Sequence, residues 1–291
     1  GVVDFTECGE YKEKDRQRLE TPDGDNWLWH HQNGARKVSF KNGAFSSVVF
    51  KKENGMLPSG SVTQIIEGTD DVVWICTNDG LVRVSGNESR IITTGIHILD
   101  AITYKDTLYF VTSKAEIYKA DPEGEEVRFV RTVNEKDTIF DVTSSFSLQD
   151  YWIILTPEKG YVFRLPEQEI VPDATMDVPN GRYIKDNRDN LWIYDDKGLI
   201  RHVHIATGKV RDIQVAADNK ITELWCSIIQ DSRGLFWIST FGDGLYIYNP
   251  VTEEMTHFTY QIEGVNHICS NTLTSVMEDR SGGIWLTSEP S

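Results

Sequence analysis

The chain of 291 residues is 39% hydrophobic and 11% aromatic, so it can bury a large core. Its formal net charge of −16 at pH 7 argues against nucleic acid or an anionic membrane as a partner, because both bind basic surfaces. No run of apolar residues is long enough to span a bilayer, and no segment has the pattern of a signal peptide. We therefore expect no direct membrane contact and no nucleic-acid partner.

Seven times along the chain, a tight turn rich in Asp and Gly runs into a bulky apolar residue, and a new strand then starts, usually at a glycine. In chain order the copies are TPDGDNWLWHHQNGARKV, GTDDVVWICTNDGLVRV, KDTLYFVTSKAEIYK, QDYWIILTPEKGYVFR, DNRDNLWIYDDKGLIRH, DSRGLFWISTFGDGLYIY and DRSGGIWLTSEPS. Their bulky residues, called anchors below, are Trp27, Trp74, Tyr109, Ile153, Trp192, Trp237 and Trp285. The anchors recur about every 35 to 48 residues, the length of a propeller blade of four short strands. The repeat therefore predicts an all-β fold, a seven-bladed β-propeller that spans residues 1–291 as a single domain.

The residue types within each copy fit short antiparallel strands. Successive residues of each predicted strand face opposite sides of the sheet, as Leu245 and Ile247 do relative to Tyr246 and Tyr248. No segment has the period of a long amphipathic helix. The third residue before most anchors tolerates the positive φ of a tight turn: Gly24, Asp71, Asp189, Gly234 and Gly282. The following strand starts where a missing side chain permits a bend: Gly34, Gly80, Gly160, Gly198 and Gly244. We expect the anchors to fill the wedges between neighbouring blades rather than to contact a ligand.

The two ends of the chain complement each other. The last copy stops soon after Trp285 and contains only two strands. If the ends were joined, Gly1 would fall where a glycine starts the third strand of other copies. We therefore predict that Val2–Phe5 supplies this third strand, that a segment near Tyr11–Lys14 supplies the fourth, and that strands from both termini close the ring. Because the chain begins in the middle of a repeat, we expect it to be a piece of a longer protein.

The sequence lacks the motifs of common catalytic and cofactor sites. It contains no Gly-rich phosphate loop, no nucleophile elbow and no HExxH pair. His202 and His204 share one face of a strand, but two imidazoles without a third ligand are weak evidence for a metal site. We expect no cofactor, no metal and no catalytic residue. The sequence leaves open whether disulfides form among its four cysteines: Cys8, Cys76, Cys226 and Cys269.

The repeat resembles that of a known family. Asp, Gly and Trp follow one another at intervals of three residues in the segment from Ile229 to Leu245, and again from Val276 to Thr287. These segments, with ENGMLPSGSVTQI from Glu53, resemble the two-component regulator propeller repeat. The resemblance implies the periplasmic sensor region of a Bacteroides-type hybrid two-component system that responds to oligosaccharides. It also implies that the kinase lies elsewhere in the full-length protein, where a second propeller and a β-sandwich are the partners. We further expect this chain to recognise an oligosaccharide, or to contribute to an inter-domain interface or to the interface of a homodimer.

The expected ligand site lies on the face where loops converge. In a propeller, the loops that enter the inner strands and those between the second and third strands meet on one face, where rigid blades hold functional residues. The predicted loops between second and third strands are 30–33, 77–79, 112–114, 156–159, 194–197 and 240–243, and the entry loops include 53–61, 173–181 and 263–271. Sugar recognition needs aromatic faces and polar groups for hydroxyls. The residues that offer this mixture are the predicted ligand-binding set: Trp29, His30, His31, Tyr194, Phe241, Asp243, His267 and Asn271.

Two alternative functions stay open at this point. The first is a propeller that holds a protein partner or dimerises and binds no small ligand. The second is a propeller lyase or hydrolase, such as the virginiamycin-type lyases that use a histidine and acidic residues with a metal on one face. His30, His31 and His267 are the residues that such chemistry could recruit, although no spacing in the sequence demands it.

Overall fold

The computed structural model describes residues 17–41, 43–133, 141–142, 144–157, 160–171, 182–186, 190–195, 198–204, 209–215, 226–260 and 268–288. The regular elements in these ranges are β-strands, and no helix in them is long and apolar enough to cross a membrane. The chain divides into two compact units. Unit 1 comprises residues 1–156 and 161–172, and unit 2 comprises residues 157–160 and 173–291. The predicted strands at Val2–Phe5 and Tyr11–Lys14, on which closure of the ring depends, lie outside the described residues.

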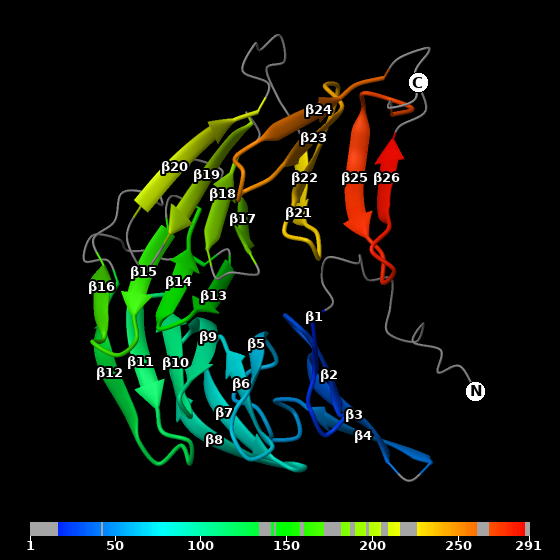
Figure 1. Ribbon diagram of the computed structural model, residues 1–291. Helices are drawn as coiled ribbons and strands as arrows, with labels where there is room; N and C mark the ends of the chain where they lie inside the picture. The colour runs from blue at the N-terminus through cyan, green and yellow to red at the C-terminus, as the bar shows by residue number, and fades with distance from the viewer. Residues whose placement is uncertain are drawn as a thin grey trace. The chain divides into compact units, whose positions relative to one another are not determined.

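Unit 1 contains four antiparallel sheets, each made of four strands that are consecutive in the sequence (Figure 1). The first sheet comprises β1 (Gln17–Glu20), β2 (Asn26–His30), β3 (Gly34–Lys41) and β4 (Ala44–Phe50). The second comprises β5 (Val62–Glu67), β6 (Val72–Thr77), β7 (Gly80–Ser85) and β8 (Glu88–Thr94). The third comprises β9 (Ile98–Tyr104), β10 (Thr107–Thr112), β11 (Glu116–Ala120) and β12 (Val127–Thr132). The fourth comprises β13 (Ser144–Leu148), β14 (Tyr151–Leu155), β15 (Gly160–Arg164) and β16 (Glu169–Val171). The first strands of adjacent sheets lie side by side, β5 against β9 and β9 against β13.

Unit 2 continues the same pattern. One sheet comprises β17 (Arg182–Lys185), β18 (Leu191–Tyr194), β19 (Leu199–His204) and β20 (Lys209–Gln214). The next comprises β21 (Cys226–Gln230), β22 (Phe236–Thr240), β23 (Leu245–Tyr248) and β24 (Met255–Phe258). Two further strands, β25 (Leu273–Glu278) and β26 (Ile284–Ser288), pair with each other, and β25 packs beside β21 and β22. All seven anchors lie on the second strand of their sheets, so the predicted repeat corresponds to one antiparallel sheet per copy.

The turns before the anchors adopt the predicted backbone. The φ angles are +84° at Gly24, +59° at Asp71, +89° at Gly234 and +82° at Gly282. These values lie in or near the left-handed region that glycine adopts freely and that aspartate tolerates. Asp189, the fifth residue of this predicted set, lies outside the described residues. The choice of Gly or Asp at this position therefore follows from the turn and not from a ligand.

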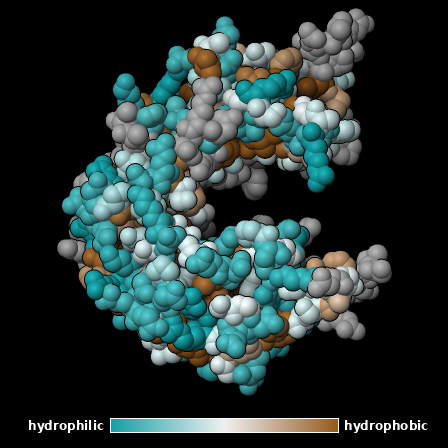
Figure 2. All heavy atoms as spheres, turned by 60° about the horizontal axis from the view of Figure 1, so that its bottom comes forward, coloured by the Kyte–Doolittle hydropathy of each residue, from teal (hydrophilic) through white to brown (hydrophobic). Residues whose placement is uncertain are grey.

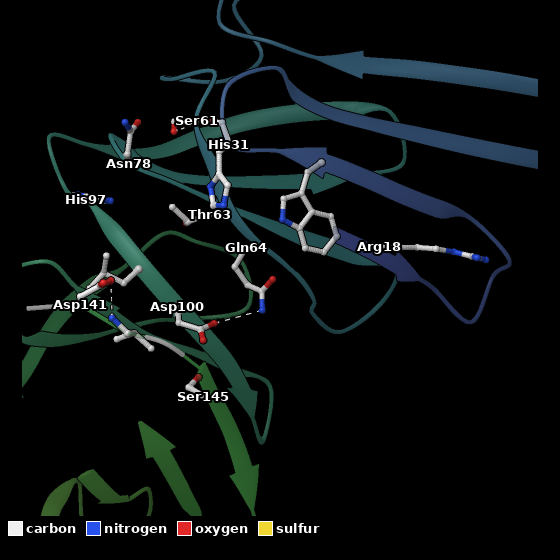
Figure 3. A pocket seen from close by; sticks show the side chains of 13 residues that line it. Arg18, His31, Ser61, Thr63, Gln64, Asn78, His97, Asp100, Asp141 and Ser145 are labelled. Carbon is white, nitrogen blue, oxygen red and sulfur yellow. Dashed lines mark hydrogen bonds between the residues drawn. The ribbon is translucent and has the colours of Figure 1, made fainter. Parts of the chain in front are cut away.

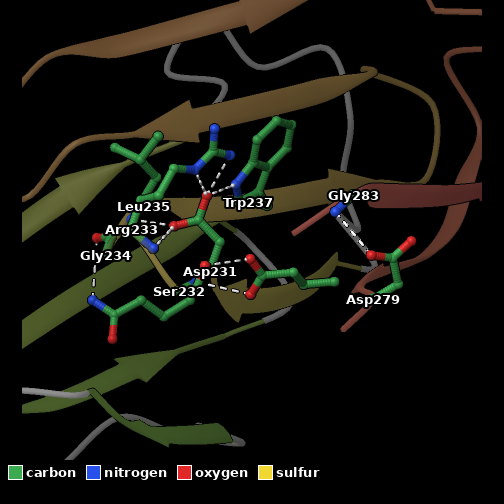
Figure 4. A network of polar contacts seen from close by, with 10 residues as sticks. Asp231, Ser232, Arg233, Gly234, Leu235, Trp237, Asp279 and Gly283 are labelled. Carbon is green, nitrogen blue, oxygen red and sulfur yellow. Dashed lines mark hydrogen bonds and ion pairs between the residues drawn. The ribbon is translucent and has the colours of Figure 1, made fainter. Parts of the chain in front are cut away.

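A buried aspartate organises the turn before Trp237 (Figure 4). One carboxylate oxygen of Asp231 accepts the backbone N–H groups of Arg233 and Leu235 at 3.0 and 2.8 Å. The other oxygen accepts the indole Nε1–H of Trp237 at 2.9 Å and the guanidinium of Arg233. Burial raises the pKa of Asp231, but these hydrogen bonds outweigh it and hold the pKa below the ordinary value. The aspartate thus fixes the turn and the anchor together.

The same indole bond recurs in the other sheets of unit 2. Asp186 accepts Nε1–H of Trp192 at 2.9 Å, and Asp279 accepts Nε1–H of Trp285 at 2.6 Å. In unit 1, Gly68 occupies the equivalent position before Trp74, and a Cβ there would lie 2.8 Å from the indole nitrogen of Trp74. The ring of Trp74 therefore takes up the space that an aspartate side chain would need.

Four of the seven anchors pack between sheets, as the sequence predicts. Trp27, Trp74, Tyr109 and Trp192 are 1%, 1%, 5% and 2% exposed. Each lies in an apolar cluster that combines residues of its own sheet with residues of the next, as when Trp74 meets Leu108 and Phe110 of β10. Burial of aromatic side chains of this size is the main attraction between such sheets. Trp285, on β26, departs from this pattern and is 60% exposed.

The glycines that start the third strands are required by close approach of the fourth strand. At Gly80, with φ +149°, a Cβ would lie 1.9 Å from the carbonyl oxygen of Thr93, and at Gly244, with φ +81°, 2.2 Å from that of Phe258. Glycine is therefore needed at these positions because a side chain would collide with the fourth strand, and not only because the chain bends there. Hydrophilic residues cover most of the face seen in Figure 2, with hydrophobic residues showing in strips between them.

Candidate functional site

Unit 1 contains a pocket of about 780 Å³ where the first strands of its sheets meet the connecting loops (Figure 3). Strand residues that line it include Thr63 and Gln64 of β5, Asp100 of β9 and Ser145 of β13. Loop residues at its rim are His31, Ser61, Asn78, His97 and Asp141. Trp29, Arg18, Leu99 and Val142 complete the lining. The lining is thus mainly polar, with few apolar side chains.

Backbone hydrogen bonds fix the rim of this pocket. The loop between the second and third strands of a sheet bonds to the loop that enters a sheet: Gly34 N–H to Gly60 O at 2.8 Å, Asn78 N–H to Ser61 O at 3.1 Å, and Ser113 N–H to His97 O at 3.0 Å. The hydroxyl of Ser61 also donates to the carbonyl of His31. Within unit 1, the predicted convergence of entry loops and second-to-third-strand loops is therefore confirmed.

Asp100 is the carboxyl group of the pocket with the most unusual surroundings. It accepts hydrogen bonds from the backbone N–H of Ala101 at 2.8 Å, from the amide of Gln64 at 3.4 Å and from Ser145. All these donors are neutral. Burial raises the pKa of Asp100 above its ordinary value, and the hydrogen bonds only partly oppose this rise. A perturbed carboxyl in a cavity is a candidate for ligand binding.

Among the described residues of the lining, Arg18 is the one arginine or lysine, and its guanidinium is bonded to other partners. The guanidinium of Arg18 donates to Asn26 at 3.0 and 2.6 Å and pairs with Glu20 at 3.1 Å. In Figure 3 the Arg18 side chain extends away from Asp100 and Gln64. Apart from Arg18, the described lining holds two carboxyl groups, Asp100 and Asp141, and two imidazoles, His31 and His97.

Two buried polar atoms of the lining have no hydrogen-bond partner within the described residues. They are the indole Nε1 of Trp29 and the hydroxyl Oγ1 of Thr63. Trp29 is only 7% exposed. Buried donors are nearly always satisfied by protein, water or ligand. Their position in the lining of a polar pocket is consistent with a ligand that supplies oxygen acceptors.

Of the predicted ligand-binding residues in unit 1, the structure brings Trp29 and His31 to this pocket. His30 follows Trp29 on β2, and its Nδ1 accepts the backbone N–H of Gln32 at 3.2 Å, so it supports the turn instead of lining the pocket. The rings of His30 and His31 lie edge to face, with centroids 6.3 Å apart. Successive side chains of a strand point to opposite faces, so Trp29 lines the pocket and the next residue, His30, does not.

The predicted residues of unit 2 take different roles. Tyr194 is 8% exposed and belongs to the apolar core between β18 and β22. Phe241, Asp243 and Asn271 lie close together: Asn271 O accepts the N–H groups of Gly242 and Gly244, and Phe241 bridges to Thr272. Asp243 accepts the hydroxyl of Tyr246 at 2.5 Å. His267 lies outside the described residues.

Sequence reasoning missed the strand residues of the pocket. The predicted loops include Ser61 and Asn78, but Gln64, Asp100 and Ser145 lie on first strands and were not in the predicted set. A signal for them exists, because these strands carry polar residues in an otherwise apolar repeat. That signal does not distinguish a pocket lining from a solvated strand face, so only the packing of adjacent sheets identifies it.

Comparison with known proteins adds information on the fold. No family model and no curated protein matches the chain. Among solved structures it is similar to the extracellular domain of a putative hybrid two component system from B. thetaiotaomicron, with 16% identity and a TM-score of 0.50 over 94% of this chain and 38% of that one. It is also similar to virginiamycin B lyase from Staphylococcus aureus, with 12% identity and a TM-score of 0.52 over 95% and 92% of the two chains.

A third similar structure is PorZ, a surface component of the type-IX secretion system of Porphyromonas gingivalis, with 13% identity and a TM-score of 0.51 over 93% of this chain and 44% of that one. At these identities the likeness shows the fold alone, which is that of the β-propellers. The chain spans 37% to 38% of the length of the B. thetaiotaomicron extracellular domains.

Proposed function

We propose that this chain is a ligand-sensing propeller from the extracytoplasmic, periplasmic part of a hybrid two-component regulator, and that its pocket in unit 1 binds a hydroxyl-rich ligand such as an oligosaccharide. The observation that carries the proposal is a polar pocket with an aromatic wall and unsatisfied buried donors, set on the first strands of rigid sheets. Pockets that combine an aromatic surface with a few fixed polar groups are typical of small-molecule sites.

The proposed mechanism is a shift in a conformational equilibrium. A ligand acts on such an equilibrium only if it binds one state more tightly than the other. Backbone hydrogen bonds from Gly34 to Gly60 and from Gly95 to Asp79 join the loops of three sheets around the pocket, so a bound ligand changes the relative stability of their arrangements. The isolated chain carries no catalytic step in this proposal, and the kinase belongs to another part of the full-length protein. There the second propeller and the β-sandwich, or a second copy of the chain, would be the partners, with no direct membrane contact.

The proposed architecture is a seven-bladed ring that strands from both termini close. In support, β25 and β26 form the one two-stranded sheet among the described residues, and Met277 and Trp285 on it are 56% and 60% exposed. Deletion of residues 1–16 is expected to speed amide hydrogen exchange along β26, because its outer edge would lose a partner strand. Unchanged exchange in the truncated protein would contradict closure.

Calorimetry against a panel of oligosaccharides tests the ligand proposal. We expect heat with at least one member, and loss of that heat in Asn78→Trp, which places a bulky ring at the rim of the pocket. The matched control is Asn87→Trp, the same substitution at an exposed position between β7 and β8, which should bind as the parent does. A folded Asn78→Trp protein that binds normally would rule out this pocket.

The same assay separates the alternatives. A protein-binding scaffold would give no heat with any oligosaccharide, and this result would overturn the sensor proposal. The fold likeness to virginiamycin B lyase keeps a lyase as the enzyme alternative. Turnover of a bound ligand that stops on chelation or in His267→Ala would favour the lyase.

A further inference from the structure

Asp100 lines the pocket without a cationic partner. Its three donors are neutral, and no ion pair in the described parts of the chain includes it. Arg18, which could have supplied a positive charge, is held by Glu20 and Asn26. An ionised carboxylate in such surroundings is costly unless a cation pairs with it. The folded chain therefore leaves a place for a positive charge beside Asp100.

We propose that this pocket selects an amino sugar, a ligand that carries a primary ammonium group among hydroxyl groups, and that the ammonium binds the carboxylate of Asp100. The inference rests on the proposed function, because it takes this pocket as the ligand site. It goes further by naming the ligand chemistry and the residue that recognises it.

The remaining lining fits the rest of such a ligand. Trp29 Nε1 and Thr63 Oγ1 are unsatisfied donors that sugar hydroxyl oxygens can accept from. Gln64 and Asn78 offer amide groups that can both donate and accept. A sugar acid fits poorly, because its carboxylate would meet Asp100 and Asp141 and the net charge of −16.

Three tetrasaccharides with one linkage test the inference: those of glucosamine, N-acetylglucosamine and glucose. They differ in the group at one ring position, and only the first carries an ammonium. At a pH at which both the amine and the carboxyl group of Asp100 are ionised, we expect calorimetry to show the glucosamine compound binding about tenfold more tightly than the other two, as one charge-assisted hydrogen bond in a partly buried site allows. Asp100→Asn should abolish this preference.

The matched control is Asp106→Asn. It removes the same charge from an exposed turn between β9 and β10 whose positive φ asparagine tolerates, and it should keep the preference in full. A fourth arm uses a simple alkyl diamine, which offers ammonium groups without hydroxyls and should bind at least tenfold more weakly than the glucosamine compound.

The outcomes separate this inference from the function on which it rests. Equal binding of the three sugars, a preference that survives Asp100→Asn, or a preference lost in Asp106→Asn would overturn the amino-sugar inference and leave an oligosaccharide sensor standing. A diamine that binds as tightly as the glucosamine compound would overturn the sugar part. If none of the three sugars binds and other oligosaccharides also fail, both proposals fall.

Discussion

The indole N–H of Trp237 donates a hydrogen bond of 2.9 Å to the carboxylate of Asp231, which also accepts two backbone N–H groups of the intervening turn. This single contact joins the local geometry of a turn to the packing between strands, because Trp237 is the anchor of its repeat. The same pair recurs as Asp186 with Trp192 and as Asp279 with Trp285. Each described sheet of unit 2 therefore contains one such hydrogen bond.

Replacing Asp231 by alanine should therefore destabilise the protein. The change leaves the N–H of Leu235 and the indole N–H of Trp237 without an acceptor, so we expect the free energy of unfolding to fall by about 2 to 3 kcal/mol. Urea denaturation followed by tryptophan fluorescence measures the loss. Glu254→Ala, at an exposed site of unit 2, is the control and should change the free energy by less than about 0.5 kcal/mol. Similar effects of the two substitutions would refute the role given to Asp231.

Stability should depend on the ionisation of Asp100. Burial raises its folded-state pKa above the unfolded value, so its contribution to stability is complete below the unfolded pKa of about 4 and is lost as the pH rises through the folded pKa. Asp100→Asn cannot ionise. In urea denaturation at a series of pH values, the variant should be more stable than the parent at neutral pH, and the difference should shrink on acidification. A difference that is constant with pH would contradict this account.

Gly80 and Gly86 offer a matched pair at the two ends of β7 and its turn. Both have positive φ, +149° and +60°, but a Cβ at Gly80 would overlap Thr93 O at 1.9 Å, whereas a Cβ at Gly86 meets nothing within 4 Å. Gly86→Ala should cost only backbone strain, about 1 kcal/mol. Gly80→Ala should cost clearly more, because the backbone of β8 must move. Equal denaturation midpoints would show that strand approach does not restrict Gly80.

Cys76 should be unreactive in the folded protein. It is fully buried, and burial, with a smaller contribution from the nearby Asp100, raises the pKa of its thiol far above the ordinary range. Cys269 is exposed, and both cysteines are free thiols. We expect alkylation at neutral pH to label Cys269 within minutes and Cys76 only when urea unfolds unit 1, as peptide mass spectrometry would show. Early labelling of Cys76 would contradict its burial.

The repeat in the sequence predicted most of the fold. Apart from Asp189, which lies outside the described residues, the Asp and Gly turns, the anchor on each second strand and the glycines before the third strands appear in the structure where the spacing predicts them. Each of them meets a local need for positive φ, buried area or missing bulk. The two copies whose anchor is not a tryptophan were also placed correctly, with Tyr109 on β10 and Ile153 on β14. The disulfide question that the sequence left open is answered for Cys76 and Cys269.

The candidate site was only partly predictable. Loop reasoning found Trp29 and His31, but it also selected Tyr194, which packs in a core. Asp100 could not be chosen, because nothing local distinguishes it from a solvated strand aspartate. Its character comes from Gln64 on β5 and Ser145 on β13, which are near it only because β5, β9 and β13 pack side by side.

The sequence by itself determined the strands, their turns and the repeated sheets, since these depend on neighbours within about 50 residues along the chain. Tertiary structure alone decided which polar residues share a cavity and which carboxyl lacks a cation, since burial and charge pairing depend on residues from separate sheets.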